Sequence, residues 1–235
     1  MASWLKPLSI IALLGFPVAL IGKRLDLFGF DVSFQIIQIT FLIALLVFFV
    51  GMIISLRKRK SHSGRSHRVG TAIYISLIPI VGLGTQIFSA TSVPEIHNIT
   101  TDTTNPPPFN KVISLRGANS NSHIYNATEL AAVQTAAYPQ VKTYYSDQSV
   151  SAMFDKSLQV IKDMSWVLVS HDANAGIIEA TETTPLWGFK DDVVIRISKQ
   201  NEKTAVDLTS VSRIGRSDLG ANAKRIVKFI NALRK

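Results

Sequence analysis

The chain has 235 residues, of which 47% are hydrophobic, a formal net charge of +9, and no cysteine. The apolar fraction is high for a soluble domain, and the missing cysteines exclude a disulfide-stabilised fold. Residues 1–90 hold nine Lys/Arg against two acids, whereas residues 91–235 hold sixteen against fourteen. Because the C-terminal part is nearly neutral, the composition argues against a nucleic-acid-binding protein.

Three apolar runs occupy the N-terminal part, at residues 7–22, 34–56 and 69–90. A helix needs roughly 20 apolar residues to cross a bilayer core, and the first run approaches this length with Trp4 and Leu5. A cleaved signal peptide is the alternative for this run, but no small-residue cleavage site precedes Lys23 and Arg24. We therefore expect a membrane domain of residues 1–90 with transmembrane helices over residues 4–22, 34–56 and 69–90.

The segment RKRKSHSGRSHR, residues 57–68, separates the second and third runs and carries six cations. Basic residues in short loops stay on the cytoplasmic side of a membrane. The pattern predicts that this segment and the N-terminus are cytoplasmic and that the C-terminal domain is extracytoplasmic. We expect an integral protein of the bacterial inner membrane with a periplasmic domain, and contact with anionic lipid headgroups is compatible with this topology.

The C-terminal part begins with a Thr-, Asn- and Pro-rich stretch, residues 91–110, which we expect to be an extended linker. Helical periodicity predicts helices over residues 151–164 and 218–234. Alternating strand-like runs flanking DANA (172–175) and QNE (200–202) predict two hairpins. Residues 111–235 should therefore form an α+β domain with a four-stranded antiparallel sheet and helices packed on one face.

The second hairpin has a preferred register, because a shift by one residue would mix its apolar and polar faces. With a two-residue turn at Asn201 and Glu202, Arg196 lies opposite Asp207. Asp191 then lies opposite Ser212.

The densest polar cluster is SRIGRSDLGAN, residues 212–222, which leads from a strand into the last helix. Unpaired N–H groups at a helix N-terminus attract anions, and arginine adds planar donors. One interpretation is a small-anion site built from Arg213, Arg216, Ser217, Asp218 and Asn222. The other interpretation is an internal network in which carboxylates satisfy the arginines, with Asp191, Asp192, Arg196, Asp207 and Ser212 as its structural members.

Enzyme signatures are missing from the sequence. It has no P-loop, no G-x-S-x-G, no H-E-x-x-H and no cysteine nucleophile. Glu179 and Glu182 are odd-spaced on a strand and face opposite sides, so they cannot act as one carboxylate pair. We expect no catalytic residue, no metal site and no cofactor.

The segments at residues 96–109, 136–147, 183–197 and 206–230 resemble the domain-of-unknown-function 1499 family, over residues 94–235 in all. The resemblance implies a domain that often follows a few N-terminal membrane spans, and it implies no known reaction. The pattern of this family is carried here by Asp191, Asp192, Arg196, Asp207, Ser212, Arg213, Gly215, Ser217, Asp218, Gly220 and Asn222.

The leading functional hypothesis is a membrane-anchored, non-catalytic envelope protein. Its expected partners are the lipid bilayer and an envelope protein or small anionic ligand, but no nucleic acid. One alternative is an envelope hydrolase using Asp191, Asp192 or Ser212. The other is an assembly factor whose transmembrane helices contact other membrane proteins, with Gly82 and Gly84 permitting close helix approach.

Overall fold

The computed structural model describes residues 3–57 and 64–235, and its internal contacts divide the chain into two compact units. One unit comprises Met1–Ala90 with Leu186–Gly188, and the other comprises Thr91–Pro185 with Phe189–Lys235. Residues 58–63 carry three of the six cations of the basic segment and lie outside the described residues.

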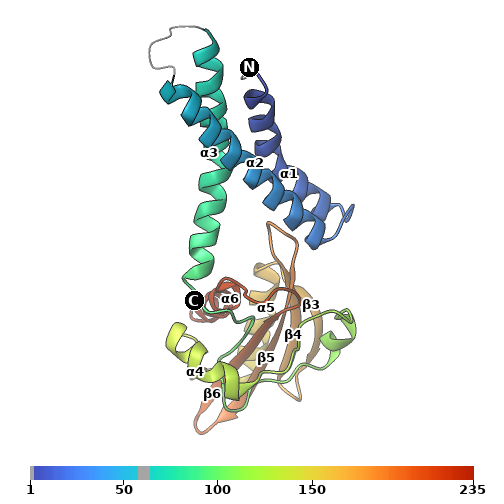
Figure 1. The fold of residues 1–235 in the computed structure, drawn as a ribbon. Helices are drawn as coiled ribbons and strands as arrows, with labels where there is room; N and C mark the ends of the chain where they lie inside the picture. The colour runs from blue at the N-terminus through green and yellow to red at the C-terminus, as the bar shows by residue number, and fades with distance from the viewer. Residues whose placement is uncertain (1–2, 58–63) are drawn as a thin grey trace. The chain divides into compact units, whose positions relative to one another are not determined.

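The first unit contains three long helices, α1 (Leu5–Arg24), α2 (Phe30–Arg57) and α3 (Gly64–Thr91) (Figure 1). Within them Leu5–Arg24, Phe30–Arg57 and His67–Phe88 are long and apolar enough to cross a membrane, which agrees with the three expected spans. Large apolar side chains such as those of Leu42 and Ile78 are exposed, whereas Ala12, Ala44 and Ala72 are buried. Small residues inside and large apolar residues outside suit helices surrounded by lipid.

The second unit is built on a six-stranded antiparallel sheet. The strand order is β1-β6-β5-β4-β3, and β2 also pairs with β6. The strands are β1 (Asn98–Thr100), β2 (Tyr144–Ser146), β3 (Val167–Asp172), β4 (Ile177–Thr183), β5 (Lys190–Gln200) and β6 (Lys203–Ser212).

The expectation of four strands is wrong, because β1 and β2 extend the sheet at its β6 edge. β1 pairs with Thr209–Val211, and β2 pairs with Thr204–Val206, so the two short strands share one long neighbour. Each has three residues, too few to show an alternating pattern, and both depend on a partner distant in sequence. β1 lies within residues 91–110, so part of the segment expected to be a linker belongs to the sheet.

One face of the sheet is covered by α5 (Val150–Asp163) and α6 (Ala221–Leu233), as expected for helices on one face. Inward-facing residues of β5 and β6, including Ile195 and Leu208, meet Phe154 of α5 and Phe229 of α6 in the main core. Trp166 stacks on Phe229 with ring centroids 5.5 Å apart. We call this side the helix face.

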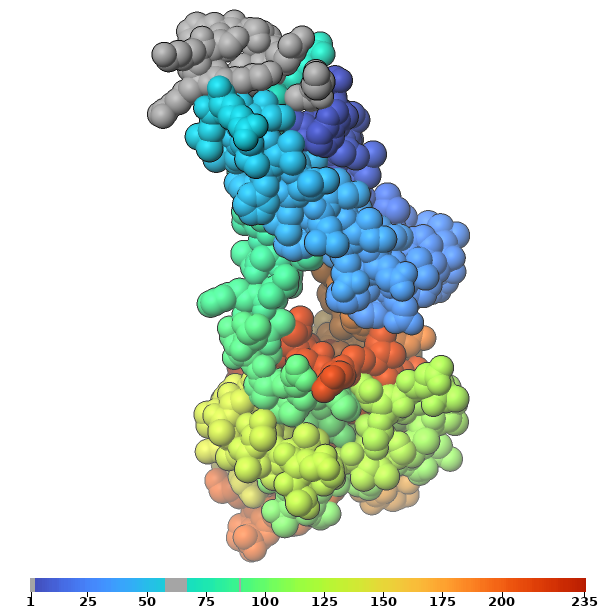
Figure 2. Space-filling model, in the orientation of Figure 1, coloured from blue at the N-terminus to red at the C-terminus, as the bar shows by residue number. Residues whose placement is uncertain are grey.

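The other side, which we call the covered face, lies beneath residues 101–125. We call these residues the covering segment, and they include the 3₁₀ helix η1 (Lys111–Leu115). Phe109 and Val112 of this segment pack on Val194 and Val211 of the sheet. In the space-filling view, green and yellow-green atoms of this part of the chain spread over the domain (Figure 2). The segment continues into α4 (Ala127–Ala137), whose Gln134 exchanges side-chain hydrogen bonds with the backbone of Thr100 in β1.

Candidate functional site

Neighbouring residues of β5 direct polar side chains to opposite faces of the sheet. Arg196 pairs with Asp207 and Asp191 pairs with Ser212, as the expected register requires. Since successive side chains of a strand alternate, Asp192 and Arg196 lie on the covered face, and Asp191 lies on the helix face. The polar residues of the sheet therefore form two separate layers.

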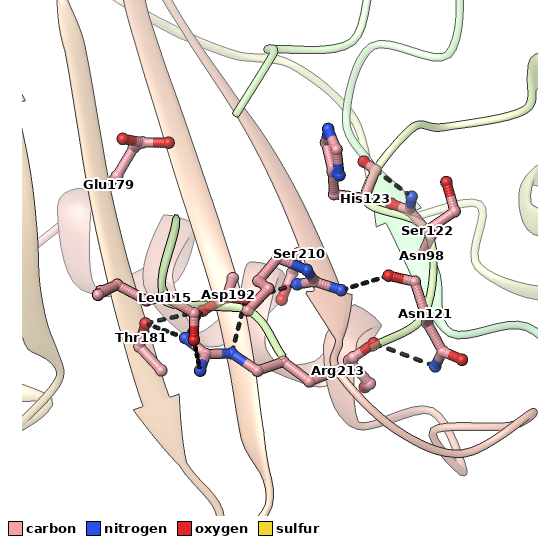
Figure 3. Close-up of polar contacts among 12 residues, drawn as sticks. Asn98, Leu115, Asn121, Ser122, His123, Glu179, Thr181, Asp192, Ser210 and Arg213 are labelled. Carbon is pink, nitrogen blue, oxygen red and sulfur yellow. Dashed lines mark hydrogen bonds and ion pairs between the residues drawn. The ribbon is translucent and has the colours of Figure 1, made fainter. Parts of the chain in front are cut away.

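On the covered face, Asp192 is fully buried and forms ion pairs with two arginines, of which Figure 3 labels Arg213. Arg213 donates from Nε and Nη2 to the two carboxylate oxygens, at 2.9 and 2.8 Å, and from Nη1 to the carbonyl of Leu115. Arg116 adds a further hydrogen bond, and Thr181 donates its hydroxyl at 2.8 Å. This carboxylate is saturated with donors from its own chain, an arrangement that fixes residues 115 and 116 to the sheet.

A second buried carboxylate on the same face, that of Asp207, lies next to Arg196. The guanidinium of Arg196 donates to Asp207 at 3.0 Å and to Asp102 at 3.0 Å. The hydroxyls of Thr101 and Thr143 donate to the other Asp207 oxygen, at 2.9 and 2.6 Å. Asp207 thus ties the start of the covering segment and the approach to β2 to the centre of the sheet.

Glu179 is the third buried carboxylate of the covered face. Its oxygens accept the backbone N–H groups of Asn110 and Lys111, at 2.6 and 2.7 Å, where η1 begins. The hydroxyl of Ser170 supplies another donor at 2.8 Å. Glu179 therefore caps η1, because it satisfies N–H groups that a helix start leaves unpaired.

The helix face has its own polar centre around Arg225, which projects from α6 towards the ends of β4, β5 and β6. Its guanidinium contacts the carboxylates of Asp191 and Glu182, the hydroxyl of Ser210 at 3.0 Å, and the side chain of Asn222. Burial raises the pKa of the Asp191 carboxyl above its ordinary value, and Arg225 opposes the rise. Buried charges of this kind need partners, and here each one has them.

Asn222 completes this centre. It accepts a hydrogen bond from Ser210 at 2.6 Å and donates to Ser212 and to the carbonyl of His97, both at 3.0 Å. The first turn of α6 is thereby bound to the strand ends and to the chain that enters β1.

The five residues of the expected anion site have different environments. Arg213 and Asn222 form the hydrogen bonds within the protein that are described above. Asp218 accepts hydrogen bonds from the N–H groups of Gly220 and Asn222, at 2.7 and 2.9 Å, at the start of α6. Ser217 accepts from the N–H of Leu219 and donates to the carbonyl of Pro94. The Arg216 side chain, by contrast, is 92% exposed, with its guanidinium 3.5 Å from Glu95.

A shallow groove of about 440 Å³ runs along the outer side of α6. Three lysines stand around it, and Met164, Val227 and Ala232 give it an apolar floor. No acidic residue lines it. The complete lining is Gln140, Met164, Lys224, Val227, Lys228, Asn231, Ala232 and Lys235.

Arg116 and Arg225 were not predicted from the sequence as members of these layers, and neither was the capping role of Glu179. Arg225 could have been noticed, because it lies one residue before Ile226 and three after Asn222, within the buried stripe of α6. Arg116 gives no such signal, since it comes from a segment without periodicity. Within residues 3–57 and 64–235, no group of three or more His, Cys, Asp or Glu side chains is placed to hold a metal ion.

The fold and the two polar layers define an antiparallel α+β domain that follows three membrane-length helices and fixes its buried carboxylates with arginine, hydroxyl and backbone donors. A family model described as "Protein of unknown function (DUF1499)" matches residues 98–233, and the chain belongs to this family. No curated protein matches the chain.

Proposed function

We propose that this protein is anchored in the bacterial inner membrane by α1, α2 and α3. The C-terminal domain lies on the periplasmic side and binds a small anionic ligand, or an anionic group of a partner, without catalysing a reaction. The distribution of lysine and arginine supports the orientation, because the basic segment between α2 and α3 favours the cytoplasmic side.

The state of the buried carboxylates supports a non-catalytic domain. A general acid, general base or nucleophile has to face an open site where a substrate can approach it. Asp192, Asp207 and Glu179 instead lie beneath the covering segment, and their oxygens are occupied by protein donors. These carboxylates hold the covering segment on the sheet through hydrogen bonds.

The groove of α6 is the observation that carries the ligand proposal. Its apolar residues, together with the surrounding lysines, suit an amphiphilic anion that lies on the surface. Among the five residues first considered for an anion site, Arg213, Ser217, Asp218 and Asn222 have hydrogen-bond partners in the protein, and Arg216 pairs with Glu95. We therefore assign the ligand-binding surface to Lys224, Lys228 and Lys235.

A binding measurement on the full chain tests this assignment. The chain is placed in nanodiscs of zwitterionic lipid and titrated with inorganic phosphate and, separately, with short-chain phosphatidylglycerol below its micelle concentration. We expect saturable binding of the amphiphile, and we expect Lys224→Ala with Lys228→Ala to weaken it by about tenfold, from two lost charge contacts of roughly 0.7 kcal/mol each. The matched control, Lys199→Ala, removes a lysine at the tip of the sheet and should leave binding unchanged. Equal binding by all variants would contradict the assignment of the ligand-binding surface to the groove of α6.

A reporter experiment tests the orientation. A reporter that is active only in the periplasm, fused after Lys235, should be active. Replacing the lysines and arginines of residues 57–68 by serine should reduce that activity, because the topology signal is lost. A reporter that works only in the cytoplasm would contradict the proposed orientation.

An assembly role is the second candidate, and α3 supplies the observation for it. Gly82 and Gly84 have nothing within 4 Å of a side chain added there, so this part of α3 leaves room for the close approach of another helix. Gly82→Leu with Gly84→Leu should abolish co-purification of a membrane partner in mild detergent and leave anion binding by the domain intact.

A further inference from the structure

The end of the sheet at which the chain enters it is defined by one row of paired residues. This row crosses four neighbouring strands. Asn98 of β1 pairs with Val211 of β6, which pairs with Asp192 of β5. Asp192 in turn pairs with Thr181 of β4. The chain arrives at Asn98 from α3, which ends at Thr91. We call this end of the sheet the entry end.

The loop between β4 and β5, residues 184–189, extends from the entry end. β4 reaches it at Thr183, opposite Lys190 at the start of β5. The loop is closed at its base by hydrogen bonds from the N–H of Thr184 to the carbonyl of Phe189, at 2.8 Å, and from the N–H of Phe189 to the hydroxyl of Thr184, at 2.9 Å. Gly188 takes a positive φ of 68°, which lets four residues, Pro-Leu-Trp-Gly, form a compact tip.

The chemistry of this tip differs from that of the turns at the opposite end. The β3–β4 turn has the sequence Ala-Asn-Ala-Gly at residues 173–176, and the β5–β6 turn is Asn201-Glu202. Those turns are composed of small and polar residues, as is usual for loops in water. The entry-end loop instead places Leu186 and Trp187 at its tip, with Leu186 exposed. Leucine and tryptophan side by side are typical of segments that enter the membrane interface, where the indole ring is preferred.

The covalent tether limits how far the entry end can be from the bilayer. Seven residue steps join Thr91 to Asn98, and a fully extended chain of that length spans at most about 25 Å. We propose that the β4–β5 loop inserts Leu186 and Trp187 into the headgroup region of the leaflet from which α3 emerges. This inference rests on the proposed membrane anchoring, and it gives the domain a second attachment point to the same bilayer.

Site-specific labelling of the full chain tests the inference, since the chain has no cysteine of its own. Leu186→Cys is labelled with a nitrobenzoxadiazole fluorophore in nanodiscs, and lipids carrying a doxyl quencher near the headgroup are added. Ala173→Cys in the β3–β4 turn is the matched control at the opposite end. Ile78→Cys in α3 lies near the middle of the membrane-length segment His67–Phe88 and reports on membrane insertion itself, read with lipids that carry the doxyl group deep in the acyl chain. Pro185→Cys gives a second reading of the loop if Leu186→Cys does not fold.

We expect the shallow quencher to remove roughly half or more of the emission at residue 186 and to leave that at residue 173 unchanged, because only an interfacial residue lies within reach of the headgroups. Quenching at residue 78 but none at residues 185 and 186 would overturn the loop inference while retaining the membrane anchor. A lack of quenching at residue 78 would overturn the anchor and the loop inference together. A label at residue 186 shielded from both lipid and water-soluble quenchers would place the loop against protein and would also overturn the inference.

Discussion

Arg213 and Asp192 form a bidentate ion pair, in which Nε and Nη2 of the guanidinium each donate to one carboxylate oxygen, at 2.9 and 2.8 Å. The carboxylate is fully buried, and the arginine side chain is 12% exposed. Arg213 also donates to the carbonyl of Leu115, so the pair joins the end of β6, the middle of the sheet and the covering segment. The most polar stretch of the sequence thus contributes at least one arginine to the interior.

We predict that Arg213→Ala destabilises the domain by about 3 kcal/mol, because it leaves a buried carboxylate with one arginine instead of two. Arg213→Lys should recover only part of the loss, since an ammonium group cannot make the two parallel contacts. Thermal unfolding of the full chain in detergent, followed through tryptophan fluorescence, measures both effects.

Arg216→Ala is the control for this prediction, three residues away in the same turn. Its side chain is 92% exposed and its partner Glu95 is 72% exposed, so the change in unfolding free energy should remain within about 0.5 kcal/mol. Equal losses for both variants would mean that the turn as a whole, and not the buried pair, determines stability.

A second prediction concerns Gly176, which ends the β3–β4 turn with a φ of 67°. A Cβ at this position would clash with the carbonyl oxygen of Ile197, and the N–H of Ile197 donates to the carbonyl of Gly176 at 2.7 Å. Gly176→Ala should therefore cost about 3 kcal/mol, from left-handed strain and a backbone clash that cannot relax. Gly117→Ala, where nothing lies within 4 Å, should be nearly neutral in the same unfolding measurement.

Elements with local periodicity could be predicted from the sequence. The three membrane-length helices, α5 and the β5–β6 hairpin follow their apolar patterns, and the position of Arg196 opposite Asp207 follows from the hairpin register. Such features depend on neighbours in sequence, which is why a single chain reveals them.

The remaining features depend on contacts between distant parts of the chain. β1 is formed from Asn-Ile-Thr, and only its pairing with β6 makes it a strand. The partners Arg116 and Asp192 are separated by 76 residues, and Arg225 and Asp191 by 34. The sequence spacing of these residues does not indicate which arginine pairs with which carboxylate. The sequence therefore predicts a polar cluster but not its ion pairs.

A third prediction uses the pH dependence of Asp191. Because burial raises the folded-state pKa above the ordinary 3.8, the folded chain retains the proton to higher pH than the unfolded chain. The stabilisation from the neutral carboxyl is complete below pH 3.8 and is lost as the pH rises through the folded-state pKa. The advantage of the wild type over Asp191→Asn in melting temperature should therefore be largest near pH 4 and should shrink towards neutrality. An advantage that grows with pH would show that attraction to Arg225 outweighs the cost of burial.

The last prediction concerns Tyr125, just ahead of α4. Its buried hydroxyl oxygen has no hydrogen-bond partner among the described residues, and burial raises its pKa from 10.0 to about 12. An unpaired buried hydroxyl costs free energy that phenylalanine avoids, so Tyr125→Phe should leave stability unchanged or raise it by up to about 1 kcal/mol.

The same substitution has a spectroscopic consequence. In an absorbance titration at alkaline pH, Tyr125→Phe should remove an ionisation step near pH 12, whereas the exposed Tyr145→Phe should leave that step in place. Since the folded-state pKa exceeds the unfolded-state value, the stability contributed by neutral Tyr125 should fall as the pH rises from about 10 to about 12. A late step that survives in Tyr125→Phe would assign it to another tyrosine, with Tyr138 the first to examine, because burial and the nearby Asp218 charge raise its pKa as well.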